Sequence, residues 1–331
     1  MTTSGTYSFT VTRDDLIREA MLNIGKLDAY GAIDPIEQTD CARKLNMMVK
    51  TWMGTYDFAP GLKIWTRQRA DLFLSSQKGQ YLLGPTGDNW AGSVATSTTT
   101  PSQSNTLTVA AAAGATVLTV GSVGAAEVTV GDYVVCCLTN GDTQSTTCTA
   151  VNLGAGTITI ANALTVAMAS GGYVYNYTTK AQRPEALVTA VLRDTNANDT
   201  PMNFMTIQTY EALPTKTTTA YQSDPTTLYY EAQLNNGVLY LDVGGAGDVT
   251  KFLHIVYLRP TQDFNNPLDT PEYPSVWYEA LSWGLSKRIC PMFDGRWDQT
   301  METNYQAALQ IARESYSDMT ETYFQPNADT P

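Results

Sequence analysis

The chain's single histidine, His254, is the first residue to test as a catalytic group, because Ser/His/Asp and Cys/His arrangements use histidine as the base. It lies in the apolar run Phe252–Tyr257, which is typical of a β-strand. The sequence also lacks the G-x-x-x-x-G-K-[ST], G-x-S-x-G and H-E-x-x-H motifs. We therefore interpret His254 as a strand residue whose ring is satisfied locally, and we expect that the protein is not an enzyme.

The cysteines do not form a metal-binding pattern. No two of them have C-x-x-C spacing, and with His254 as the only histidine a Cys/His zinc site lacks its ligands. The glycine-rich stretch 244–248 lies between two β runs and lacks the helix that a phosphate-binding loop requires, so we interpret it as a turn. We expect neither a metal nor a cofactor, and we interpret the five cysteines as inert packing residues. They are Cys41, Cys136, Cys137, Cys148 and Cys290.

Paired carboxylates offer one other chemistry, because glycosidases use two acids beside aromatic sugar platforms. Asp294 and Asp298 flank Arg296 and Trp297 between two expected helices. Asp298 also stands at the expected start of the second of these helices, where an aspartate commonly caps the helix. A glycan-binding or cell-wall-hydrolysing protein is kept as an alternative function, although we interpret Asp298 first as a helix cap.

The net charge of −12 argues against a protein that grips nucleic acid, because phosphate binding needs clustered Lys and Arg. Acidic residues are concentrated near the C-terminal end, since residues 261–331 carry four basic and eleven acidic side chains. An acidic wall repels the phosphate backbone and lets a duplex pass without sticking. The composition thus excludes sequence-specific DNA binding but is compatible with a channel through which DNA moves.

The N-terminal stretch does not resemble a signal peptide, because residues 1–12 are polar and uncharged. No apolar run reaches the roughly 20 residues that a membrane-spanning helix needs. We expect a protein without a membrane partner that is assembled in the cytoplasm of its host cell.

Helix signals are clear at the N-terminal end. Thr12 is an N-cap followed by an apolar stripe that Gly25 ends, and a second helix is expected from Asp34 through Trp52. Residues 63–74 are typical of a strand, and the turn residues 75–79 predict that it pairs with residues 80–83 in a hairpin.

The segment 86–180 differs in composition from the rest, with only five charged side chains among its Thr, Ala, Gly, Ser and Val residues. Its short β runs, divided by Gly, Asn and Asp turns, predict a small antiparallel barrel or sandwich. We interpret the segment as a self-contained insertion. The β runs are 115–120, 133–138 and 157–160.

Strand patterns continue to about residue 260, with Asn236-Gly237 as a hairpin signal between two of them. A helix is then expected from Pro274 to Pro291, with Trp277 in its buried stripe, and a long helix from Asp298 to about Tyr323. The expected class is α+β, with a helical core formed by both chain ends and a β-rich middle. The expected domains are 1–85, the insertion 86–180, the β-rich region 181–272 and the C-terminal helices 273–331.

Five aromatic or apolar residues are candidates for contacts with a partner. Trp283 lies off the buried stripe of its helix, so it is either an interface residue or partly buried. The other four lie at the C-terminal end and either anchor a partner contact or pack within the subunit. They are Tyr316, Met319, Tyr323 and Phe324.

Taken together, these features resemble the head-to-tail adaptor, or tail accessory factor, family of short-tailed bacteriophages. The likeness covers roughly two thirds of the chain, excludes the segment 86–180, and rests on diffuse patterns. It is carried by Thr12–Gly25, Asp34–Trp52, Tyr273–Leu281 and Leu285–Pro291, by Tyr305, Ala308 and Ala312, and by middle segments including Arg183-Pro184 and Tyr257–Pro260.

The resemblance implies a structural virion protein at the head–tail junction. Its subunits would form a ring, expected to be dodecameric, that docks under the portal protein with the C-terminal helix and tail directed toward it. A distal tail protein, the nozzle or tail tube, would bind the other side, and DNA would pass through the centre without sequence-specific binding. Another phage tail or minor capsid protein is the main alternative, because a β-rich middle is equally natural there.

Overall fold

A computed structural model describes residues 9–28, 30–54, 66–92, 104–218 and 220–315 of the chain. The chain divides into two compact units. The helical unit is formed by Met1–Thr66 together with Pro260–Pro331, and the β unit by Arg67–Arg259. The α+β class predicted from the sequence is confirmed.

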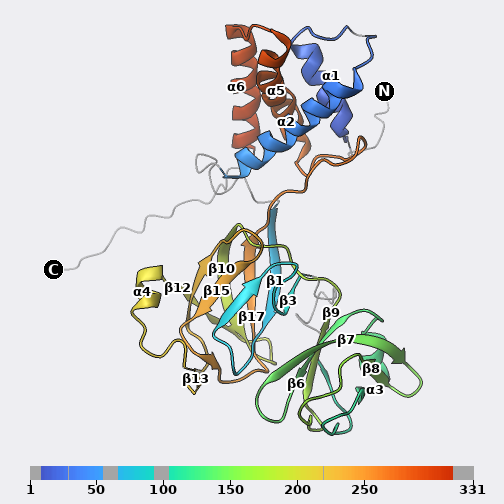
Figure 1. Ribbon diagram of the computed structural model, residues 1–331, viewed down its shortest axis with the longest axis vertical. Coiled ribbons are helices and arrows are strands. Elements are labelled where there is room, and N and C mark those ends of the chain that lie inside the picture. Colours follow the sequence, from blue (N-terminus) through green and yellow to red (C-terminus); the bar gives the residue numbers. More distant parts are fainter. Residues whose placement is uncertain (1–8, 29, 55–65, 93–103, 219, 316–331) are drawn as a thin grey trace, which may run out of the picture. The chain divides into compact units, whose positions relative to one another are not determined.

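The helical unit contains helices from both ends of the sequence (Figure 1). Side chains cap three of them, because Thr12 forms a capping box with Asp15, Asp34 accepts from the Ile36 amide, and Asp298 accepts from the Met301 amide. The expected N-terminal boundaries are therefore correct. The helices are α1 (Arg13–Asn23), α2 (Pro35–Gly54), α5 (Tyr278–Ile289) and α6 (Gln299–Glu314), with 3-10 turns at Ser275–Trp277 and Cys290–Phe293.

One hydrophobic core joins the four helices of this unit. Trp277 is 2% exposed, as its position in the stripe predicted, and it packs with Trp52 of α2 at a ring separation of 6.0 Å. Gly284 is required beside that pair, because a Cβ atom there would lie 2.8 Å from the Trp52 ring. The core is made by Ile17 and Met21 of α1, Leu45 and Met48 of α2, Leu281 and Leu285 of α5, and Leu309 and Ala312 of α6.

The β unit contains a sheet with the strand order β11-β10-β17-β1-β3 and another with the order β12-β14-β15-β2. The first consists of β11 (Asp199–Pro201), β10 (Ala186–Arg193), β17 (Phe252–Leu258), β1 (Arg67–Phe73) and β3 (Trp90–Ala91). The second consists of β12 (Asn203–Phe204), β14 (Thr227–Glu231), β15 (Gly237–Leu241) and β2 (Gln80–Leu83).

The predicted hairpin between residues 63–74 and 80–83 is wrong. β1 pairs with β17 and β3, whereas β2 pairs with β15, so consecutive strands enter different sheets. Long-range pairing decided this, because β1 pairs over its whole length with β17 and β2 pairs with β15. The second predicted hairpin is correct, since β14 and β15 pair antiparallel on either side of Asn236.

The glycine-rich stretch near residue 245 is also more than a turn. Gly245–Ala246 forms β16, which pairs in parallel with β13 (Gln222–Ser223). A Cβ atom at Gly245 would lie 1.9 Å from the Ser76 carbonyl oxygen, so the glycine permits a close backbone approach. The described residues also include two helices that the sequence did not predict, α3 (Gly121–Ala126) and α4 (Ile207–Glu211).

The Thr/Ala/Gly-rich segment forms a sheet with the order β4-β9-β6-β7-β8-β5. A backbone hydrogen bond from Thr108 to the Thr119 carbonyl joins the two outer edges of this order, and β8 alternates buried and half-buried residues as predicted. The strands are β4 (Ser104–Thr106), β9 (Tyr173–Tyr177), β6 (Tyr133–Cys137), β7 (Thr143–Asn152), β8 (Thr157–Ile160) and β5 (Val117–Thr119).

This segment has its own apolar cluster, but it also shares a core with the neighbouring sheet of the β unit. Phe73 of β1 stacks on Tyr175 of β9 at 4.8 Å between ring centroids, and Phe252 lies 5.9 Å from the same tyrosine ring. The segment is therefore fastened to β1 and β17 by aromatic packing. None of the helices in the described part of the chain combines the length and apolar content that crossing a bilayer requires.

Candidate functional site

Trp283 is the one predicted contact residue that the structure describes, since Tyr316, Met319, Tyr323 and Phe324 lie outside the described residues. It is half-buried on α5, and its ring meets the Trp297 ring edge-on at 6.4 Å between centroids. Trp283 also lines a groove between α1 and α5. The interpretation of Trp283 as partly buried is therefore confirmed, and its role in a partner contact stays a prediction.

The groove has a volume of about 460 Å³, which is in the range of sites that accept a side chain or small ligand. Its apolar lining includes Val11, Leu16 and Trp283. Phe9 stands at its edge, 71% exposed, with its ring 6.1 Å from that of Tyr278. An apolar hollow with an exposed aromatic residue at its edge is suited to an apolar side chain of a partner.

Carboxylates surround this apolar lining. Asp15, Glu19 and Glu279 line the groove, and no Lys or Arg belongs to its described lining. The Thr12 hydroxyl and the Thr12 amide hydrogen-bond to the Asp15 carboxylate and lower its pKa, so that it is fully ionised at neutral pH. The groove therefore combines an apolar floor with a negative rim.

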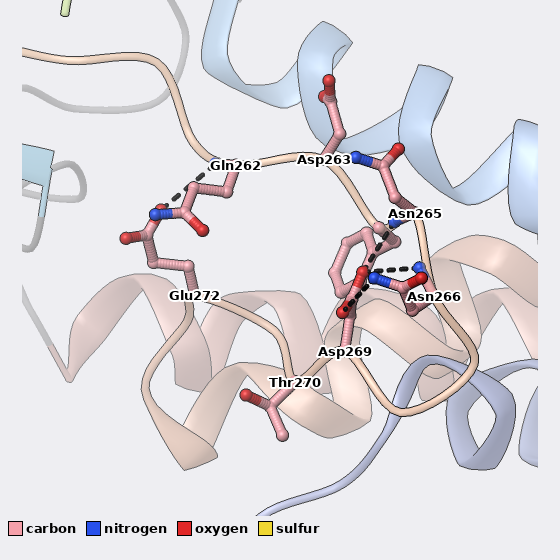
Figure 2. A pocket seen from close by; sticks show the side chains of 8 residues that line it. Gln262, Asp263, Asn265, Asn266, Asp269, Thr270 and Glu272 are labelled. Carbon is pink, nitrogen blue, oxygen red and sulfur yellow. Dashed lines mark hydrogen bonds between the residues drawn. The ribbon is translucent and has the colours of Figure 1, made fainter.

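A second, polar hollow of about 340 Å³ lies in the loop 262–272 of the helical unit (Figure 2). Two of its three carboxylates are bonded within the loop: Asp269 accepts from the backbone amides of Asn265 and Asn266, and Glu272 accepts from the Gln262 amide. The third, Asp263, pairs with Lys50 of α2 at 2.8 Å. The bonds from the Asn266 amide and then the Asn265 amide lower the pKa of Asp269. The hollow is thus the interior of a turn that its own hydrogen bonds hold in shape.

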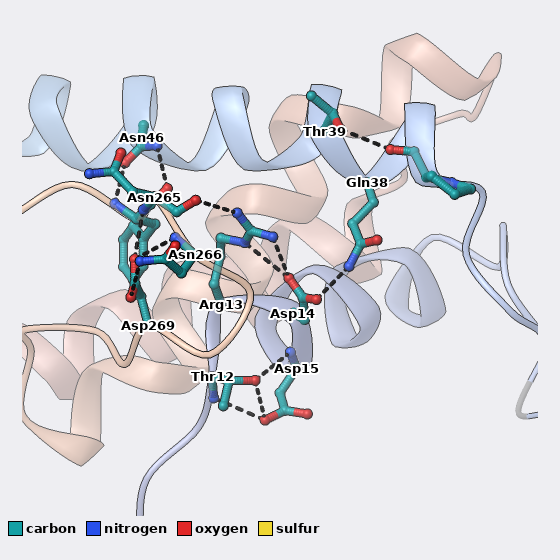
Figure 3. A network of polar contacts seen from close by, with 12 residues as sticks. Thr12, Arg13, Asp14, Asp15, Gln38, Thr39, Asn46, Asn265, Asn266 and Asp269 are labelled. Carbon is teal, nitrogen blue, oxygen red and sulfur yellow. Dashed lines mark hydrogen bonds and ion pairs between the residues drawn. The ribbon is translucent and has the colours of Figure 1, made fainter.

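The same loop is bound to the first two helices (Figure 3). The Arg13 guanidinium donates to the Asn265 carbonyl and pairs with Asp14, which accepts from Gln38 of α2 at 2.6 Å. The Asn46 side chain donates to the Phe264 carbonyl and accepts from the Phe264 amide. These bonds tie residues near the start of the chain to a loop far along it. Within the described residues, no group of three or more His, Cys, Asp or Glu side chains is arranged to hold a metal ion.

The interpretation of His254 as a locally satisfied strand residue is confirmed. Its Nδ1 lies 2.6 Å from Oδ1 of Asp71, which is directly opposite on β1 and fully buried. The other carboxylate oxygen of Asp71 has no hydrogen-bond partner among the described residues. The pair therefore places a carboxylate and an imidazole in direct contact inside the sheet.

Asp298 caps α6, as expected, with its Oδ1 accepting from the Met301 amide at 2.8 Å. The nearby acid that stands out is Glu302, which the sequence did not single out. It accepts from Lys287, Gln306 and the Trp297 indole, and these bonds lower its pKa to about 2. Trp297 is therefore held by a carboxylate inside the unit. This geometry accounts for the Asp298 and Trp297 side chains without a sugar.

All five cysteines are buried and unpaired. Burial raises the pKa of Cys41 to about 11 and that of Cys136 and Cys137 to about 12. A thiol must lose its proton to act as a nucleophile, so these residues are unreactive at neutral pH. This agrees with their interpretation as packing residues.

Comparison with known proteins gives no relative to guide the assignment, since no family model and no curated protein matches the chain. The residues that the sequence interpretation missed are Phe9, Val11, Glu19 and Glu279. A signal was present at Val11, because an apolar residue directly before an N-cap commonly packs against the helix that follows. The two glutamates carry no local signal, since only the pairing of α1 with α5 brings them to one groove.

Proposed function

We propose that this protein is a head-to-tail adaptor of a short-tailed bacteriophage. Its subunits form a ring, taken to be dodecameric, under the portal protein. The ring continues the DNA channel and receives the distal tail protein, and the protein is located at the head–tail junction of the virion.

The observation that carries the proposal is the common core of α1, α2, α5 and α6. These helices come from opposite ends of the chain and pack together around Trp277, with the β unit inserted between them in the sequence. A helical body built from both ends of the chain can be repeated around an axis. The sequence of the inserted unit can then change without altering that body. This is the organisation that the resemblance implies for an adaptor.

Two further observations favour a binding role over catalysis. The groove beside Trp283 has an apolar floor and a negative rim, which suits a protein partner. The carboxylates of the polar hollow have partners within the helical unit, because Asp269 and Glu272 accept from loop amides and Asp263 pairs with Lys50. The overall negative charge also favours a channel that does not retain DNA.

Electron microscopy of the purified protein, alone and mixed with the portal protein of the same particle, tests the proposal. We expect closed rings that cap the portal coaxially. A fibre, or the absence of any association with the portal, would refute the adaptor and favour another tail or minor capsid protein. Glycan hydrolysis is tested in parallel, because activity on cell-wall material that is lost in Asp294→Asn would support the enzymatic alternative.

A further inference from the structure

α1 and α5 run in the same direction along the two sides of the groove. The ring of Phe9, which precedes α1, lies 6.1 Å from the ring of Tyr278, the first residue of α5. Toward the other end, the Ser286 hydroxyl of α5 donates to the Ala20 carbonyl of α1 at 3.1 Å. The hollow therefore follows two helices over part of their length, and a surface of this kind receives an amphipathic helix.

The groove is long enough for about two turns of a third helix. Asp15, Glu19 and Asn23 line its α1 side at four-residue spacing, so they lie on one line along the helix. From Asp15 to Asn23 an α-helix rises roughly 12 Å, at about 1.5 Å per residue. Two apolar side chains at positions i and i+4 of a bound helix match this length, and Leu16 and Trp283 are in place to contact them.

The charges of the rim are available to a partner. The Glu19 and Glu279 side chains are exposed, and neither has a hydrogen bond or ion pair within the described part of the chain. Glu279 lies in the first turn of α5, where the helix dipole favours a carboxylate, but Glu19 lies within α1 and has no such local role. Since the described lining contains no Lys or Arg, a partner must supply the cations that balance these carboxylates.

We propose that the groove binds a basic amphipathic helix of a different protein. Two apolar side chains of that helix insert between α1 and α5, and its Lys or Arg side chains face Glu19 and Glu279. The proposal rests on the proposed function for the premise that this face of the helical unit meets a partner, and it names the chemistry of that partner. Opposite charges around an apolar contact raise the association rate and fix the register of the bound helix.

The ion pairs of the helical unit argue against a second copy of the chain as the occupant. Within the described residues, no helix offers more than one Lys or Arg side chain without a carboxylate partner, because the others form ion pairs inside the same unit. One cation cannot match carboxylates on both sides of the groove. The pairs are Arg13 with Asp14, Arg43 with Asp40, Lys50 with Asp263 and Lys287 with Glu302.

The longer segments outside the described residues do not supply the missing cations either. Residues 1–8 and 93–103 carry no charged side chain, and residues 55–65 carry one Lys and one Asp. Residues 316–331 carry three carboxylates and no Lys or Arg, so in the groove they would bring like charges together. None of these segments has an excess of positive charge, and the complement of the rim therefore comes from a different protein.

A model peptide tests this chemistry on the full chain. The probe is a fluorescent, end-capped peptide of about four helical turns, with leucine at i, i+3, i+4 and i+7 spacing and lysine at the positions between. Fluorescence anisotropy at physiological salt measures its affinity. The groove variant, which carries Glu19→Lys and Glu279→Lys, should bind it at least about tenfold more weakly. Phe9→Ala removes an exposed ring from the edge of the groove and should weaken binding by roughly threefold.

A second peptide, with glutamate in place of lysine, should show the opposite preference. It should bind weakly to the unmodified protein and more tightly to the groove variant, and this exchange also shows that the groove variant is folded. A control with Asp28→Lys and Glu127→Lys makes the same change in net charge at other exposed or half-exposed sites and should bind the lysine peptide like the unmodified protein. A scrambled lysine peptide, which has no apolar stripe, should bind at least about tenfold more weakly.

Several results would overturn the inference. Equal weakening in the control and the groove variant would show attraction to net charge alone, and equal binding of the scrambled peptide would show that the apolar floor is not used. Self-association of the unmodified chain that the groove variant abolishes would assign the groove to a second copy. Peptide binding that appears only after deletion of residues 1–8 would assign it to that segment.

The outcome is distinguishable from that of the proposed function. Rings on the portal without binding of the lysine peptide leave the adaptor standing and remove this inference. Specific binding of the lysine peptide without rings removes the adaptor and leaves the ligand chemistry of the groove in place. Tight binding of the lysine peptide, its loss in the groove variant and the reversed preference of that variant together support the inference.

Discussion

The helical unit and the β unit differ in which chain segments form them. The helical unit joins two segments that the whole β unit separates in the sequence, and hydrogen bonds such as that between Asn46 and Phe264 connect them. The β unit is one continuous segment whose sheets are held by strand pairing and by stacked rings such as Phe73 and Tyr175. Both units combine polar and aromatic contacts, and they differ in that the contacts of the helical unit join two segments that the β unit separates in the sequence.

This difference has a consequence for function. The helical unit carries surface charges of both signs and contains the groove with its negative rim. The Thr/Ala/Gly-rich part of the β unit has few charges to direct an electrostatic partner. Matched substitutions in the two units test this difference.

The largest effect is expected from removing one central tryptophan in each unit. Trp277 is 2% exposed in the helical core, and Trp90 is 0% exposed in the β core. Either Trp→Ala change should cost about 3–5 kcal/mol of unfolding free energy through the cavity that it leaves. Because the two side chains belong to different hydrophobic clusters, each change should act mainly on its own unit.

Hydrogen exchange followed by mass spectrometry, resolved to peptides of each unit, measures this. Trp277→Ala should increase exchange in α1, α2, α5 and α6, and Trp90→Ala in β1 and β17. Equal loss of protection in both units from either substitution would show that the chain unfolds as a single cooperative body.

An intermediate effect is expected from the buried carboxylate of the β unit. Asp71→Ala leaves the His254 ring without its partner in a buried part of the sheet, which should cost about 1–3 kcal/mol. Asp14→Ala breaks a comparable polar contact in the helical unit, but the Asp14 side chain is 30% exposed, so the cost should stay below about 1 kcal/mol.

Urea denaturation of both variants gives the two unfolding free energies. A larger loss for Asp14→Ala would contradict the importance of burial. Because His254 is the only histidine, its ring signal in NMR spectra reports directly on the broken pair.

The smallest effect concerns acid stability. The pKa of Glu302 is lowered from its ordinary value of 4.5 to about 2, first by Lys287 and then by Gln306 and Trp297. A carboxylate with a lowered folded-state pKa stabilises the fold above its ordinary pKa, and this contribution is lost as the pH falls toward 2. Because Lys287 is partly exposed, the contribution should not exceed about 1 kcal/mol.

Glu302→Gln should therefore lower the unfolding free energy of the helical unit near neutral pH and flatten its decline between about pH 4.5 and 2. Asp199→Asn is the matched change in the β unit, because Arg193 lowers the pKa of Asp199 by the same kind of bond. Denaturation curves at several pH values, read by hydrogen exchange in each unit, distinguish the two. An unchanged acid profile in both variants would show that these exposed pairs contribute nothing measurable.

Local signals in the sequence determined the helices of the helical unit. Thr12, Asp34 and Asp298 each mark the start of a helix, because a capping side chain bonds to amides only two or three residues away. The burial of Trp277 also follows from spacing alone, since helical periodicity places it on an apolar stripe. Even the hairpin at Asn236 is a local feature, because a short turn brings its two strands together.

Only the tertiary structure decided which distant segments meet. Strand patterns in residues 67–73 and 80–83 gave no reason to separate them into two sheets, because a strand edge can pair with any other edge of suitable register. In the same way, Glu19 and Glu279 became parts of one groove only when α1 packed against α5. A residue's own neighbours fix its local conformation, but a surface for a partner is made from residues far apart in the chain, and their meeting depends on how the whole core packs.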